Sequence, residues 1–145
     1  MGFQFSLQSV LQVRGIREEQ EERMLQKILH ETVRARETLA QIEARIMELD
    51  AARHGNCFKS SVGHTIHAAY GELKELKQNK KDFQDKITKL EELRDKQLII
   101  YSKARQNREV LSGMCEEKRK AYELYMTHIE QKALDDIFIS RRRRN

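Results

Sequence analysis

The chain has 145 residues, of which 35% are charged, 39% are hydrophobic and 6% are aromatic, and it contains neither proline nor tryptophan. This composition suits long helices better than a globular core, because proline, the strongest helix breaker, is absent. The formal net charge is +5, and Arg141–Arg144 supply four of those charges. Acidic and basic residues alternate through the rest, which excludes a basic face that coats nucleic acid.

Two further properties bear on the compartment. The cysteines, Cys57 and Cys115, lie far apart without CxxC spacing, which favours a reducing compartment over a disulfide scaffold. No run of about 18 apolar residues is present, and the first residues lack the pattern of a signal peptide. We expect a cytoplasmic protein without direct membrane insertion.

Apolar residues in the first third of the chain recur at alternating steps of four and three, which predicts a helix over about residues 4–53. A 3.5-residue period keeps one side of a helix against a partner helix, so this row is the seam of a coiled coil. The charged stretch Arg14–Arg23 keeps the same phase and is predicted to be helix, not linker. The seam positions are Leu7, Leu11, Arg14, Glu18, Glu21, Leu25, Ile28, Thr32, Ala35, Leu39, Ile42, Ile46 and Leu49.

The pattern fails in RHGNCFKSSVGH, where glycine, asparagine and serine predict a turn over about residues 54–61. A second seam then runs without losing phase, which predicts a helix over about 62–139 and a basic tail over 140–145. Its positions are Val62, Ile66, Ala69, Leu73, Leu76, Lys80, Phe83, Ile87, Leu90, Arg94, Gln97, Tyr101, Ala104, Arg108, Leu111, Cys115, Lys118, Tyr122, Tyr125 and Ile129. A short turn between two heptad helices favours an antiparallel pair over parallel or higher-order assembly. The predicted fold is all-α: one coiled-coil domain over 1–145, a long two-helix antiparallel hairpin whose second helix is longer.

Folding the chain about Phe58 predicts which segments face each other. Glu18 and Glu21 would lie opposite Arg94–Tyr101, where the second seam is also polar. Polar seam positions penalise a slip by one heptad, because slippage would bury a carboxylate against leucine. An alternative is that these charges face a partner protein, and both can hold.

The same estimate leaves the second helix without a partner helix from about Cys115 onward. An unpaired apolar stripe that long is typical of an interaction site. The alternative is that Phe3 and Phe5 fold over part of it. The residues expected to be unpartnered are Leu111, Met114, Cys115, Tyr122, Leu124, Tyr125 and Ile129.

Other sites are less well supported. His54, Cys57, His64 and His67 have spacing compatible with zinc, but a turn between long helices needs no metal, and polar turn residues explain them better. A two-helix fold lacks the concave pocket that catalysis or a cofactor needs, so we expect no enzyme activity and no cofactor. Arg141–Arg144 are interpreted as a solvated tail, not as a specific nucleic-acid site.

The stretch FQFSLQSVLQVRGIREEQEE, residues 3–22, resembles the opening of the flagellar FliJ family, in which Phe-x-Phe-x-Leu, a Val-Leu pair and an arginine precede an acidic helix. The C-terminal stretch YELYMTHIEQKALDDIFISRR is similar to the last helix of that family. The resemblance covers the whole chain, and the four-arginine ending departs from it.

The resemblance implies a non-enzymatic part of the flagellar type III export apparatus, similar to the central stalk of rotary ATP synthases. Its implied partners are the hexameric export ATPase, the export gate membrane protein and export chaperones, and its implied location is the cytoplasmic side of the inner membrane, in peripheral association with the apparatus. Ring contacts would be Phe3, Phe5, Leu7, Leu11, Arg14, Arg17, Tyr122, Tyr125, Ile129, Leu134 and Asp135, and gate contacts Tyr70, Leu73 and Leu76. The competing hypothesis is a coiled-coil scaffold or dimerisation module with no role in export.

Overall fold

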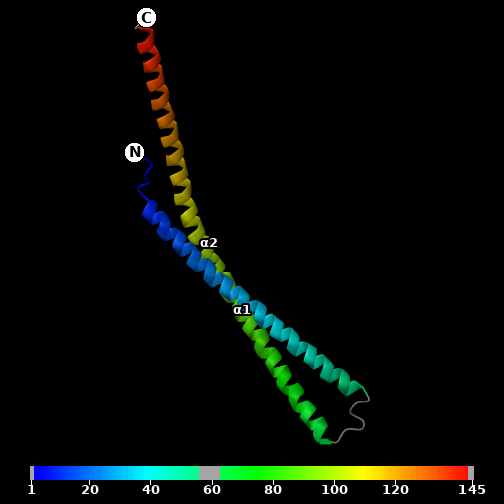
Figure 1. Ribbon diagram of the computed structural model, residues 1–145. Coiled ribbons are helices and arrows are strands. Elements are labelled where there is room, and N and C mark those ends of the chain that lie inside the picture. The colour runs from blue at the N-terminus through cyan, green and yellow to red at the C-terminus, as the bar shows by residue number, and fades with distance from the viewer. Residues whose placement is uncertain (1, 56–62, 144–145) are drawn as a thin grey trace. The chain divides into compact units, whose positions relative to one another are not determined.

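The computed structural model describes residues 2–55 and 63–143, which form two helices and, within those ranges, no strand. Helix α1 spans Gln8–His54 and helix α2 spans Gly63–Arg142, 47 and 80 residues (Figure 1). The predicted all-α fold with a longer second helix is confirmed. Most of the segment predicted as the turn, residues 54–61, lies outside the described residues.

The chain divides into two compact units. One consists of Glu21–Ile100, and the other consists of Met1–Gln20 with Tyr101–Asn145. Within each unit a part of α1 packs antiparallel against a part of α2 (Figure 1).

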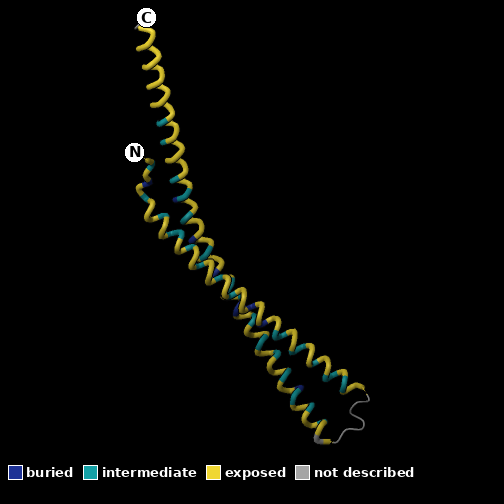
Figure 2. The backbone as a smooth tube through the Cα atoms, viewed as in Figure 1, coloured by how far each residue is buried: buried dark blue, intermediate teal, exposed yellow. Residues whose placement is uncertain are grey.

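The predicted seams form the contact between the helices. Every seam position from Leu7 to Leu49 is buried or half-buried, and so is every described position of the second seam from Ile66 to Cys115 (Figure 2). In the unit Glu21–Ile100 the buried residues are Thr32, Ala35, Leu73, Leu90 and Gln97, and in the other unit they are Phe5, Ala104 and Leu111.

This core is thin. Among the described residues no large side chain is fully buried, and the buried ones lie in single file along the helices. The buried hydroxyl of Thr32 donates a 2.8 Å hydrogen bond to the carbonyl of Ile28, so its burial leaves no unpaired donor. Stability therefore depends on many small contributions along the seam.

Helix α1 begins at Gln8 instead of about residue 4. The aromatic pair Phe3 and Phe5 accounts for this, because both rings contact α2. Residues two apart point to the same side in extended chain but to nearly opposite sides in a helix. The Gln8 amide donates to the Phe5 carbonyl at 3.1 Å, which turns the chain into the helix.

Replacing a seam leucine tests the single-file core. Leu90→Ala should lower the free energy of unfolding by about 2 kcal/mol, because Leu90 is only 6% exposed and the cavity cannot be filled from elsewhere. The matched control is Leu93→Ala one turn away, where the side chain is 49% exposed and the cost should be below about 0.5 kcal/mol. Urea titration followed by circular dichroism measures both, and equal losses would contradict the seam assignment.

Candidate functional site

The charged stretch of α1 meets polar residues of α2 in the unit that contains residues 1–20. Glu18 is 14% exposed and accepts hydrogen bonds from Nε and Nη2 of Arg108, the second at 3.4 Å. Arg14 donates from Nη1 to the carbonyl of Asn107 at 2.8 Å. These bonds cross from one helix to the other at seam positions, so the seam is held here by charge.

The hydrogen bond with Glu18 raises the pKa of Arg108 above its ordinary value, although desolvation of the guanidinium opposes the shift. Because the folded protein holds this proton more tightly than the unfolded chain does, the shift stabilises the fold at every pH below the ordinary pKa of arginine. This contribution is lost only as the pH rises beyond that value. The guanidinium group of Arg108 therefore stays protonated at physiological pH.

A second polar contact lies in the unit Glu21–Ile100. Gln97 is 7% exposed, and its Nε2 donates to the Glu21 side chain at 2.6 Å and to the Glu21 carbonyl at 3.1 Å. The prediction that Glu21 faces Arg94–Tyr101 is confirmed. Glu18 instead accepts its hydrogen bonds from Arg108, whose long side chain reaches that carboxylate from further along the second seam.

Ion pairs also cross between the helices of this unit at its surface. Arg36 pairs with Glu91 at 2.5 Å, Arg45 with Glu72 at 2.9 Å and Lys80 with Glu43 at 3.1 Å. Such exposed pairs contribute little to stability. They fix which residues of the two helices are neighbours.

The predicted overhang of α2 begins later than expected. Leu111 is buried, Cys115 and Tyr122 are half-buried, and these three expectations were therefore wrong. The Phe3 ring lies 5.8 Å from the Tyr122 ring, and the Lys118 ammonium lies 5.5 Å from the Phe5 ring. The alternative in which the aromatic pair covers part of the stripe is thus correct. Residues 2–5 are not helical, and non-helical chain can span more length per residue than a helix does, so these residues reach further along α2.

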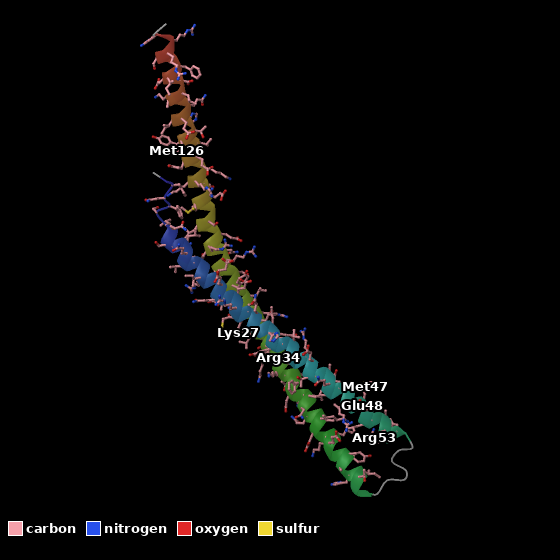
Figure 3. All side chains as sticks on the ribbon, in the orientation of Figure 1. Lys27, Arg34, Met47, Glu48, Arg53 and Met126 are labelled. Atoms are coloured by element: carbon pink, nitrogen blue, oxygen red, sulfur yellow. The ribbon has the colours of Figure 1, made fainter. Side chains whose placement is uncertain are left out.

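Beyond Tyr122 the helix has no such cover. Every described residue from Glu123 to Arg143 except the half-buried Met126 is exposed, and no other described segment of this unit lies beside the helix there (Figures 2 and 3). We call residues 123–143 the exposed C-terminal segment. Its large apolar side chains with more than two-fifths of their area exposed are Leu124, Tyr125, Ile129, Leu134, Ile137, Phe138 and Ile139.

The residues expected at the ATPase ring therefore fall into two groups. One group packs within its own unit: Phe5 is buried, and Phe3, Leu7, Leu11, Arg14 and Tyr122 are half-buried. The other group, Arg17, Tyr125, Ile129, Leu134 and Asp135, is exposed. Only the second group presents free side-chain surface to a partner.

The residues expected at the export gate lie near the start of α2. Tyr70 is 52% exposed, Leu76 is half-buried and Leu73 is 7% exposed in the seam. A cleft of about 210 Å³ opens between the two helices beside Tyr70, close to the end of α1 where Arg53 lies (Figure 3). The lining residues are Leu49, Arg53, Ile66, Ala69, Tyr70 and Leu73.

The described residues meet neither the requirements of a metal site nor those of a membrane-spanning helix. Among the described residues no three His, Cys, Asp or Glu side chains are grouped as metal ligands. Cys57 and the side chain of His64 lie outside the described part of the chain. None of the described helical stretches is apolar for long enough to cross a bilayer. The described chemistry is that of packing surfaces and exposed side chains, which suits binding.

Sequence reasoning missed three exposed residues near the end of α2. Ile137, Phe138 and Ile139 follow one another, so they give no heptad signal. The signal that was available is the direct junction of this apolar run with four arginines.

Comparison with known proteins identifies a family. The family model described as FliJ, Flagellar FliJ protein, matches residues 3–145. No curated protein and no solved structure matches the chain.

The Glu18–Arg108 pair yields a stability prediction. Arg108→Gln should lower the free energy of unfolding by about 1 kcal/mol, because it leaves a mostly covered carboxylate without its cation. The effect should largely vanish when Glu18 is already glutamine. Arg119→Gln is the control, since Arg119 bonds Glu123 within the same helix and not across the pair. Denaturant titrations of the single and double variants measure this coupling, and strictly additive losses would contradict it.

Proposed function

The chain belongs to the flagellar FliJ protein family, and we propose that it is a coiled-coil stalk for the export ATPase. In this role it binds the hexameric ATPase ring, promotes ring activity and links the ring to the export gate. Members of this family are non-catalytic components of flagellar protein export.

The exposed C-terminal segment is the observation that carries this proposal. Two antiparallel helices cover each other only as far as the aromatic pair reaches, and α2 then continues as a single helix with apolar side chains in solvent. A surface of this kind is typical of a protein interaction site. A ring of six subunits with a central opening can surround a single helix, whereas a flat partner would cover one side of it.

Exposed charge in the same unit supports the same role. Arg17 is exposed on the segment of α1 that packs in the same unit, and Asp135 is exposed on α2. Exposed charges exchange partners at low cost, because they keep much of their hydration. A stalk gripped in turn by different subunits needs an apolar end and such exchangeable charges.

The gate contact is proposed for the cleft beside Tyr70. A half-exposed tyrosine at the rim of an apolar cleft is a common anchor in protein interfaces. Leu73 lines the cleft but is buried in the seam, so its part in binding is to shape the floor. Peripheral location at the inner-membrane export apparatus follows from these two partners, and the exposed C-terminal segment also offers a surface to export chaperones.

A coiled-coil scaffold without a role in export is the competing function. Its exposed apolar segment would be covered by a second copy of the chain. Stable self-association together with no effect on the ATPase would favour that function.

The ring contact is tested by stimulation of the cognate ATPase. A chain ending at Lys120 should lose most of its stimulation while keeping its helical circular dichroism, because the removed segment makes few contacts within the chain. Tyr125→Ala with Ile129→Ala should lower stimulation about tenfold or more, as expected for interface anchors.

The matched control is Ile99→Ala with Val110→Ala, which removes apolar side chains of similar exposure elsewhere on α2. Undiminished stimulation by the chain ending at Lys120 would rule out the ring assignment.

A crossed comparison of two tyrosines tests the gate contact. Tyr70→Ala should weaken binding to the cytoplasmic part of the gate protein about tenfold and leave ATPase stimulation unchanged. Tyr125→Ala should do the reverse. Binding is measured by titration calorimetry, and a Tyr70→Ala protein that binds the gate normally would show that the cleft serves another purpose.

A further inference from the structure

The last turns of α2 combine an apolar face with arginines. Because α2 extends to Arg142, the first arginines of the basic run are helical and have a fixed direction. Leu134, Ile137, Phe138 and Arg141 follow the spacing i, i+3, i+4 and i+7, which places them on one side of the helix. The three apolar side chains are 57%, 50% and 70% exposed. We call this side the C-terminal face.

The cations at this face are not neutralised nearby. No ion pair joins Arg141, Arg142 or Arg143 to a carboxylate in the part of the chain that the structure describes. Asp135 and Asp136 point elsewhere, since each residue turns the helix by about 100° and they follow directly after Leu134. Apart from the four terminal arginines, the sequence holds 24 basic residues (28 less 4) and 23 acidic ones. The uncompensated charge of the chain is therefore concentrated beside this face.

The arginines and the apolar side chains also share one shallow hollow. Phe138, Ile139, Arg141 and Arg142 line it, so two arginines and two large apolar residues border the same hollow. Guanidinium groups bind phosphate oxygens in pairs. An open hollow on a single helix does not enclose a ligand, and it suits a flat surface.

We propose that the C-terminal face binds the surface of a membrane that contains anionic phospholipid. The phosphate groups of the lipid would pair with Arg141 and Arg142, Arg143 would add to the local positive charge, and Leu134, Ile137 and Phe138 would enter the boundary between headgroups and acyl chains. Helices that lie on membranes combine these same two features. A nucleic acid fits less well, because binding along its backbone needs a basic stripe and several stacking aromatic rings, whereas acidic residues precede this face.

Apart from Leu134, which is also among the residues expected at the ATPase ring, this surface differs from the one proposed for the ring. At about 100° per residue, Tyr125 and Ile129 point away from the side that carries Leu134 and Phe138. Tyr125 and Ile129 continue the line of the seam. The membrane contact thus goes beyond the proposed function, and the two can fail separately.

The test is sedimentation of the full chain with vesicles at low salt. Vesicles of equal parts phosphatidylglycerol and phosphatidylcholine should bind it, and vesicles of phosphatidylcholine alone should not. Replacing Arg141, Arg142 and Arg143 by glutamine should weaken binding about a hundredfold, since each arginine near an anionic surface contributes roughly a fivefold factor. Phe138→Gln should weaken it about tenfold with all charges kept.

A charge-matched control replaces Lys81, Lys89 and Lys96 by glutamine. These lysines are exposed on α2 away from the C-terminal face, and their removal should change binding less than threefold. Tyr125→Ala with Ile129→Ala should likewise leave vesicle binding unchanged. Circular dichroism of each variant confirms that α2 is intact.

Three results would overturn the proposal. The first is no binding to the anionic vesicles, and the second is an equal loss in the lysine control. The third concerns the variant in which the three arginines are replaced. If that variant still binds the vesicles but no longer binds a short single-stranded oligonucleotide that the unchanged chain binds, the proposal is wrong. ATPase stimulation is measured on the same proteins, so a failed membrane contact with normal stimulation leaves the stalk function standing.

Discussion

The fold depends on one constraint: each helix keeps a single apolar row at 3.5-residue spacing against the other helix. Within the two helices the buried side chains follow this row and never form a second layer, so burial there is shallow. A core of this kind cannot enclose a ligand or exclude water from a reacting group. It leaves most of each helix surface free, and this is why the chemistry of the chain is that of its exposed side chains.

The polar positions of the seam modify this constraint. Glu18 with Arg108 and Glu21 with Gln97 replace apolar contacts by hydrogen bonds that only one alignment of the helices satisfies. A uniformly apolar seam would bind more tightly but would tolerate a slip by seven residues. A slip would move Phe3 and Phe5 along α2 and change where the exposed C-terminal segment begins. The charged stretch of α1 therefore sets the length of the surface that α2 offers to partners.

Sequence periodicity predicted most of this architecture, because burial in a coiled coil depends on local spacing alone. The predicted seams include every described residue of α1 that is buried and every described residue of α2 that is buried, the last of which is Leu111. It failed where the chain departs from a helix. Phe3 and Phe5 contact α2 from non-helical chain, which the heptad rule does not describe, so the overhang was placed too early. The exposed run Ile137–Ile139 was missed for a related reason, since consecutive apolar residues belong to no single face.

The exposed C-terminal segment has a physical cost that bears on its role. Isolated helices are marginal in water, and most helical stability in proteins comes from packing. Residues 123–143 have no second helix, yet they hold seven large exposed apolar side chains, whose aggregation the terminal arginines oppose by their charge. Seam residues continue on one side of the segment, and the C-terminal face lies on another. A single partner on one side would leave the other side in water, which agrees with the two proposed partners, one that contacts the continued seam at Tyr125 and Ile129 and one that presents negative charge to the C-terminal face.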